Sequence, residues 1–148
     1  MSDTNFQIIT SYVTMKDANA AIAFYKKAFG ATEDLRIEGP GGKIGHAGLT
    51  VYGGKIMMSD EMPGMSPPPA NGSSSVNFYV MVDNPDQAFE KAVKAGATEA
   101  YPVSDKFYGH RVGAVKDPFG YVWHLAKVVE ELSKDEMIER AKTAFTKG

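Results

Sequence analysis

The chain has 148 residues, of which 43% are hydrophobic and 23% charged, and its formal net charge is −2. This balance is typical of one folded domain and excludes a disordered chain. It supplies no strong basic field, so we expect neither nucleic acid nor a membrane surface as a partner. The sequence contains no cysteine, which excludes disulfides, thiol nucleophiles and thiolate metal ligands.

The N-terminal residues and the apolar segments indicate the cellular location to expect. Residues 1–5 lack the basic and apolar segments of a signal peptide. No apolar run approaches the roughly 20 residues that a membrane-spanning helix needs. We therefore expect a cytoplasmic protein.

The first half of the chain predicts one strand, one helix and three strands. Residues 6–15 are rich in Ile, Thr, Tyr and Val, which favours a strand. Residues 17–29 place apolar side chains three or four positions apart, which predicts a helix, and Gly30 is suited to end it. Three strand-like segments separated by glycine-rich turns then follow, at 32–37, 43–51 and 55–59.

Residues 60–74 separate this unit from the next one. The segment contains four prolines together with Gly, Ser and Asn, a composition typical of a linker. It could also act as a lid over a cavity, but most such segments are connectors.

The second half repeats the order of the first. Residues 75–82 predict a strand, and Asn84 and Pro85 suit the start of a helix that ends before Gly96. Strand-like segments follow at 98–103, 109–116 and 121–128. The tripeptide Gly-Ala-Thr occurs after the helix in both halves, at 30–32 and 96–98. We interpret the two halves as copies of one βαβββ unit.

A third helix is predicted near the end of the chain, over residues 133–146. Ser133 and Glu136 match a capping box, in which each side chain accepts a hydrogen bond from the other residue's backbone N–H. The sequence therefore predicts an α+β fold in one domain spanning 1–148. Its parts are βαβββ modules at 6–59 and 75–128, the linker at 60–74, and the C-terminal helix.

The alternation of side chains along the strands predicts a pocket. Residues 76, 78, 80 and 82 are all apolar, so their face of the strand should meet the helices. The opposite face then carries Asn77 and Tyr79, and the equivalent positions elsewhere are Thr10, Tyr12 and His124. Small polar groups, tyrosines and a histidine in apolar surroundings are typical of a small-molecule site.

Two of the candidate residues have more than one interpretation. His124, with an ordinary pKa of about 6.5, could act as a general base or as a hydrogen-bond partner for a ligand, or it could serve only the structure. Arg111 could bind a carboxylate or phosphate, or it could form a salt bridge with Asp105 or Asp117. We expect Asp117 to start a turn by accepting backbone N–H groups.

The histidines and tyrosines elsewhere are less distinctive. We expect His46 to have a structural role and His110 to occupy an exposed position in a loop. Tyr12 and Tyr79 could stack on an aromatic ligand or simply fill the interior.

Residues 24–31 (Phe-Tyr-Lys-Lys-Ala-Phe-Gly-Ala) and 117–124 (Asp-Pro-Phe-Gly-Tyr-Val-Trp-His) resemble the vicinal oxygen chelate superfamily. This superfamily includes glyoxalase I, bleomycin-resistance proteins and extradiol dioxygenases. Residues 45–47, 57–61 and 107–111 are similar to its PhnB-like branch. The resemblance implies a cupped, mixed sheet of eight strands, a ligand site in the cup and a homodimer.

Metal-dependent members of this superfamily place four ligands in the cup. Here the matching positions fall near Thr10, near Met58 (or its neighbours Ser59 and Asp60), at Asn77 and at His124. Of these only His124 is a good ligand for a divalent ion, and Asp60 in place of Met58 would make two ligands, too few for a tight site. We therefore expect no metal site and no other cofactor.

Three functions remain open at this point. The first is a small-molecule-binding protein similar to bleomycin-resistance proteins. The second is a glyoxalase-like lyase or isomerase that uses His124 as base with a weakly bound divalent metal. The third is a dimerisation module whose cup is filled.

Overall fold

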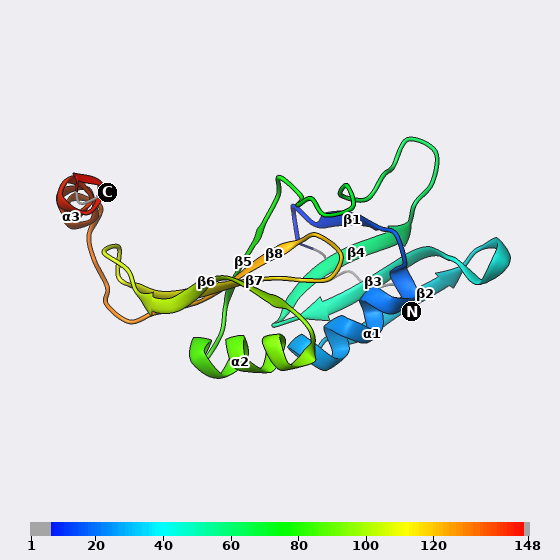
Figure 1. Cartoon of the computed structure of the whole chain (residues 1–148), viewed down its shortest axis with the longest axis horizontal. Helices are drawn as coiled ribbons and strands as arrows, with labels where there is room; N and C mark the ends of the chain where they lie inside the picture. The colour runs from blue at the N-terminus through cyan, green and yellow to red at the C-terminus, as the bar shows by residue number, and fades with distance from the viewer. Residues whose placement is uncertain (1–6, 147–148) are drawn as a thin grey trace.

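The computed structural model describes residues 7–146 (Figure 1). The predicted first strand begins later than expected, at Ser11, and Phe6 and the segment 1–5 lie outside the described residues. In chain order the elements are β1 (Ser11–Met15), α1 (Ala18–Phe29), β2 (Thr32–Glu38), η1 (Pro40–Gly42), β3 (Ile44–Val51), β4 (Gly54–Asp60), β5 (Phe78–Met81), α2 (Pro85–Ala95), β6 (Thr98–Asp105), β7 (His110–Lys116), β8 (Val122–Val128) and α3 (Lys134–Thr146).

Each half of the chain builds one four-stranded mixed sheet with the same strand order. The first sheet has the order β1-β4-β3-β2 and the second the order β5-β8-β7-β6. The pairs β1–β4 and β5–β8 are parallel, and the other pairs are antiparallel. The predicted α+β fold with two βαβββ units and a C-terminal helix is therefore confirmed, with the eight strands divided equally between two sheets.

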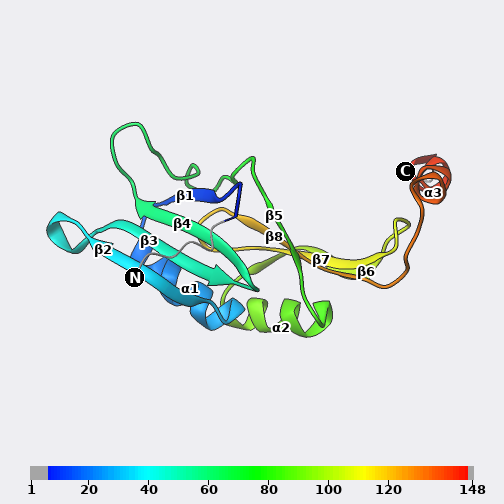
Figure 2. The same cartoon turned by 180° about the vertical axis from the view of Figure 1, so that it is seen from behind.

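The two module helices lie along one side of the sheets, with their C-terminal ends next to each other (Figures 1 and 2). Asp17 caps α1 by accepting a hydrogen bond from the Ala20 N–H, and Gly30 ends the helix in the left-handed conformation. Asn84 caps α2 in the same way, as predicted, through the Gln87 N–H. These caps fix where each helix begins.

The core fills the space between the helices and the sheets, and aromatic rings from both halves meet there. Trp123 of β8 lies 4.3 Å from the ring of Phe78 and 4.6 Å from that of Phe29 on α1. Trp123 and Phe29 are buried. Burial of this apolar surface holds the two modules together.

Asp117 is a buried carboxylate that joins the two modules. It accepts backbone hydrogen bonds from Phe119 and Tyr121, as predicted for a residue that starts a turn. It also accepts hydrogen bonds from the Tyr25 hydroxyl of α1 and the Trp123 indole. Burial raises the pKa of Asp117, although these four donors act in the opposite direction.

The segment between β4 and β5 is docked against the turn that joins β7 to β8. The Ser74 N–H donates to the Gly120 carbonyl at 2.7 Å. Gly120 has a φ of +97°, and a Cβ at this position would lie 2.9 Å from Pro68. The glycine therefore allows both the turn and the close approach of the proline-rich segment.

The helix α3 lies at one end of the molecule, beyond the β6–β7 hairpin (Figures 1 and 2). The predicted capping box is present: the Glu136 N–H donates to Ser133 Oγ, and the Ser133 N–H donates to Glu136 Oε1. Arg140 binds Glu130 and the Phe107 carbonyl, and Phe145 packs edge-on against Phe107. Within residues 7–146, no helix is long and apolar enough to cross a membrane.

Candidate functional site

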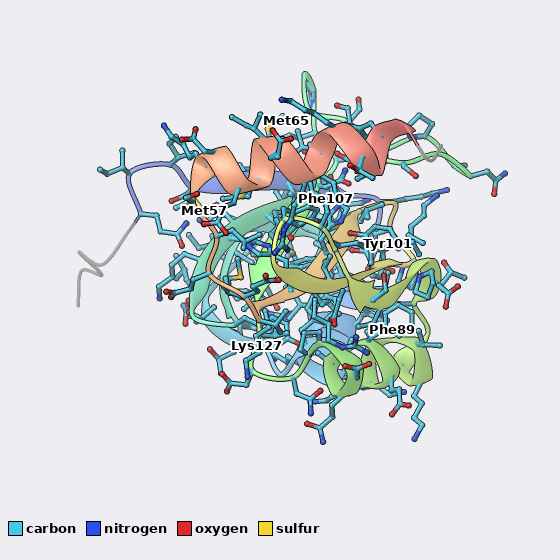
Figure 3. The ribbon with its side chains drawn as sticks, turned by 90° about the vertical axis from the view of Figure 1, so that its left-hand side faces the viewer. Met57, Met65, Phe89, Tyr101, Phe107 and Lys127 are labelled. Carbon is cyan, nitrogen blue, oxygen red and sulfur yellow. The ribbon has the colours of Figure 1, made fainter. Side chains whose placement is uncertain are left out.

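The second sheet has one face turned toward the helices and one turned away from them, which we call the open face. Phe78 and Trp123 pair across β5 and β8 and pack toward α1. The next pair, Tyr79 and His124, therefore points to the open face. In Figure 3, Tyr101 and Phe107 are on the side of α3, whereas Phe89 and Lys127 are on the side of α2.

Six polar and aromatic side chains gather on this open face, and we call them the Tyr–His cluster. Tyr79 and His124 stack with their ring centroids 5.6 Å apart. The Tyr101 hydroxyl lies 2.6 Å from His124 Nδ1, and the Tyr79 hydroxyl lies 2.8 Å from His110 Nδ1. The cluster is formed by Asn77, Tyr79, Tyr101, Tyr108, His110 and His124.

Both ring nitrogens of His124 are engaged in hydrogen bonds. Nε2 lies 2.8 Å from Asn77 Oδ1, which can only accept, so Nε2 carries the proton. Nδ1 is then free to accept the hydrogen bond from the Tyr101 hydroxyl. Burial lowers the pKa of His124, which also favours the neutral ring. To act as a general base, His124 would have to break its hydrogen bond with Tyr101.

The two paired phenols keep their protons at neutral pH. Burial is the main cause that raises the pKa of Tyr79, and interactions with Tyr108 raise it further. Burial and the charge of Tyr108 raise the pKa of Tyr101 as well. The cluster therefore presents neutral hydroxyls and a neutral imidazole rather than a phenolate nucleophile.

A β-bulge brings Tyr101 to His124. The register of β6 against β7 shifts on both sides of Tyr101, which pairs with Ala114, and Ala114 in turn pairs with His124. On the other face of β7, a Cβ at Gly113 would lie 2.5 Å from Val103 Cγ2 and 2.8 Å from Val103 N. Because Gly113 has no side chain, the bulged strand β6 can lie this close to β7.

The structure brings together three of the predicted ligand-binding residues, namely Asn77, Tyr79 and His124. Tyr12 lies on the open face of the first sheet, where its hydroxyl is 3.1 Å from His46 Nδ1. Thr10 precedes β1, and its hydroxyl donates to the Gln7 carbonyl. The first sheet therefore carries a smaller Tyr–His pair of its own, separate from the cluster.

Arg111 lies apart from the cluster, on the face of β7 that meets α2. Its guanidinium forms two hydrogen bonds of 2.8 Å with the two carboxylate oxygens of Asp86 and one of 3.0 Å with Asp105. Of the two interpretations of Arg111, the contacts match the salt bridge with Asp105. The larger share of the contacts comes from Asp86 of α2, which was not among the expected partners.

Tyr101, Tyr108 and His110 were not predicted from the sequence as residues of the candidate site. His110 was expected in an exposed loop, but it is the first residue of β7 and only partly exposed. Val112 and Ala114 lie two and four residues after His110, on the same face of β7. This alternation could have placed the His110 side chain on the open face from the sequence alone. Tyr101 gave no such signal, because the bulge breaks the alternation of β6.

The residues at the metal-ligand positions of the superfamily do not fit a divalent ion. Met58 is fully buried on the helix-facing side, and the Asp60 carboxylate accepts the N–H groups of Ala18 and Ile44. His124 Nε2 is bound to an amide oxygen. Among residues 7–146, no three His, Cys, Asp or Glu side chains come together to hold a metal.

A separate cleft of about 1030 Å³ lies between the proline-rich segment, the start of α1 and the β7–β8 turn. Lys16, Asp17, Glu61 and Lys116 line it, so its rim carries charges of both signs. None of the predicted ligand-binding residues is among its lining residues.

Comparison with known proteins agrees with this architecture. Residues 7–125 match the model of the Glyoxalase/Bleomycin resistance protein/Dioxygenase superfamily. The chain is 37% identical over 134 residues to the uncharacterized protein Rv0887c of Mycobacterium tuberculosis, covering 87% of this chain and 79% of that protein.

Two solved structures are similar to it. The crystal structure of TioX from Micromonospora sp. ML1 is 26% identical, with a TM-score of 0.68 over 82% of this chain and 98% of TioX. The structure of the Arabidopsis thaliana gene product At5g48480 is 29% identical, with a TM-score of 0.67 over 82% of this chain and 99% of that one. The chain belongs to the Glyoxalase/Bleomycin resistance protein/Dioxygenase superfamily.

Proposed function

We propose that this protein binds a small organic molecule on the open face of the second sheet, in the manner of a bleomycin-resistance-like binding protein. The observation that carries the proposal is the hydrogen-bonded state of His124, whose two ring nitrogens are held by Tyr101 and Asn77. A histidine held in this way orients neighbouring groups and offers a flat surface, whereas a general base needs an available lone pair.

The alternative of a glyoxalase-like lyase or isomerase receives less support from the same residues. That chemistry would need a base or a metal ion next to the substrate. The Nδ1 lone pair of His124 already accepts from Tyr101, and the positions expected to supply metal ligands hold Met58 and an engaged Asp60. Binding requires neither group.

We also propose that the protein belongs to the PhnB-like branch of its superfamily. Two of the three motifs that resemble this branch, 45–47 and 107–111, contribute side chains to the open faces: His46 bonds with Tyr12, and Tyr108 and His110 are part of the Tyr–His cluster. The motif at 107–111 therefore coincides with the surface that we assign to ligand binding.

A second copy of the chain is proposed to close the site and form a homodimer. A typical pocket buries most of its ligand's surface, yet the open faces leave large side chains in solvent. Tyr12, Leu35, Ile37, Tyr79 and Met81 are each between 41% and 52% exposed. The first sheet offers mainly apolar side chains and the second a polar aromatic surface, so opposing faces of two copies would enclose a mixed pocket.

A thermal-shift screen of the purified protein against a metabolite library tests the binding function. A ligand at 100 times its Kd stabilises by about 2.7 kcal/mol, which corresponds to a Tm increase of about 5–10 °C for a domain of this size. The shift should be lost in Tyr79→Ala and kept in Arg111→Gln, which alters the opposite face. Equal shifts in both variants, or turnover of a hit at a rate abolished by His124→Ala, would contradict a binding role for the cluster.

A further inference from the structure

We infer that the ligand of the Tyr–His cluster is a planar aromatic molecule with an oxygen-acceptor substituent, of which an aromatic carboxylate is the simplest example. The inference rests on the proposed binding function and specifies its ligand class. Three properties of the cluster support it: its flat aromatic surface, its unused N–H donors and the positive charge of Lys106 beside it.

The flat surface comes from stacked and tilted rings on neighbouring strands. The planes of Tyr79 and His124 differ by only 21°, and Tyr101 lies beside the same imidazole with its ring centroid 5.5 Å away. About half of Tyr79 is exposed, so its free ring surface is open to a ligand. A planar ring gains offset-stacking energy on such a surface that a saturated ring of similar size does not.

The unused polar groups on this surface are N–H donors. Asn77 Oδ1 faces His124, so both hydrogens of the Asn77 amide nitrogen remain available, with no protein acceptor among the described residues. His110 accepts at Nδ1 when the Tyr79 hydroxyl donates, and its Nε2–H is then available in the same way. Oxygen acceptors on a ligand would satisfy these donors.

The charge next to the cluster is positive. Lys106 places its ammonium 5.0 Å from the centre of the Tyr101 ring. Within residues 7–146, no hydrogen bond or ion pair links the cluster to an Asp or Glu. A cationic ligand would be repelled by Lys106, which already occupies the Tyr101 ring, and a carboxylate would be attracted.

Four probes separate these contributions in calorimetric titrations of the full-length protein. 2-Naphthoate combines an aromatic ring and a carboxylate, and decahydronaphthalene-2-carboxylate retains only the carboxylate. 2-Naphthamide retains the ring and a neutral acceptor, and 2-(aminomethyl)naphthalene carries a cation instead. We expect 2-naphthoate to bind at least tenfold more tightly than the saturated acid and the amine, with 2-naphthamide in between.

Two lysine variants test the charge with a matched control. Lys106→Gln should weaken the binding of 2-naphthoate several-fold and leave the affinity for 2-naphthamide unchanged, because only the carboxylate interacts with the ammonium. Lys127→Gln removes a charge from the opposite face of the second sheet (Figure 3) and should change neither affinity. Two-dimensional NMR should place the largest shifts at the Asn77 side-chain amide and at His110 and His124.

The outcomes distinguish this inference from the function on which it rests. Equal binding of the saturated acid, or tighter binding of the amine, would overturn the ligand class and leave a binding site at the cluster. The ligand class would also be overturned if the NMR signals of the cluster shifted with a library compound that has neither an aromatic ring nor an oxygen acceptor, but did not shift with 2-naphthoate. No response of the cluster to any compound would overturn both proposals.

Discussion

Tyr79 and His124 lie opposite each other on the parallel strands β5 and β8, and their rings stack 5.6 Å apart on the face turned away from the helices. This relationship is set by strand register, because a shift of either strand by one residue would turn its ring toward the core. Trp123, one position before His124, opposes that shift by packing on Phe29 of α1, and Phe78, one position before Tyr79, packs on Trp123. The aromatic core therefore positions the candidate site.

Removing the Tyr101 hydroxyl should release His124 Nδ1. The donated hydrogen bond stabilises the neutral ring in addition to burial, so Tyr101→Phe should raise the pKa of His124, with burial still holding it below the ordinary value, and reduce stability by about 1 kcal/mol. NMR titration of the imidazole protons measures the pKa, and chemical denaturation the stability. Tyr52→Phe on the first module is the control, and an identical pKa in both variants would contradict the proposed hydrogen bond.

The lowered pKa of His124 makes stability depend on pH. The folded pKa lies below the unfolded value of about 6.5, so between the two values the unfolded chain binds more protons and stability falls as pH decreases. Above the unfolded pKa, His124 is neutral in both the folded and the unfolded chain, so the stability that its protonation would remove is fully retained. His124→Gln should reduce the loss of Tm between pH 7.5 and 5.5 relative to the unmodified protein. Parallel Tm curves for the two proteins would show that His124 is not shifted.

The Asp117 carboxylate should matter for stability more than for binding. In Asp117→Asn, an NH₂ group replaces one acceptor oxygen and meets donors, either the Tyr25 hydroxyl and the Trp123 indole or the two backbone N–H groups. We expect a loss of about 3 kcal/mol, measured by chemical denaturation. Tyr25→Phe removes a single donor and should cost about 1 kcal/mol; a larger loss in Tyr25→Phe than in Asp117→Asn would contradict this account.

Gly113 should be intolerant of a side chain. Because its Cβ would lie 2.8 Å or less from Val103 atoms, including the backbone N, Gly113→Ala must displace β6 and should cost about 1–3 kcal/mol. The NMR contact between Tyr101 and His124 should weaken in the same variant. Gly48→Ala on the first sheet has open space around its Cβ and serves as the comparison. If both variants are equally stable, the close approach of β6 does not hold the cluster together.

The proposed dimer should depend on the open face of the first sheet. Leu35→Asp places a charge on a half-exposed apolar surface, so burying that surface against a second copy would become unfavourable. Light scattering should report a monomer for Leu35→Asp and a dimer for the control Gln87→Asp on α2. A dimer in both variants, or a monomer for the unmodified chain, would reject this interface.

The sequence predicted the modules well, and the site only where alternation is regular. The helix caps at Asn84 and Ser133 and the shared face of Asn77, Tyr79 and His124 follow from local patterns. Tyr101 was missed because a bulge reverses its face, which depends on the absent side chain of Gly113. The pairing of Arg111 with Asp86 depends on how α2 packs on β7, which no local pattern records.

The most direct test follows the His124 and Tyr79 rings by NMR while a ligand from the thermal-shift screen is added to the unmodified protein. If the ligand binds at the cluster, the signals of both rings should shift together and saturate with the Kd found by calorimetry, and Tyr79→Ala should abolish binding. Shifts confined to the cleft beside Lys16 and Lys116, with the two rings unchanged, would contradict it.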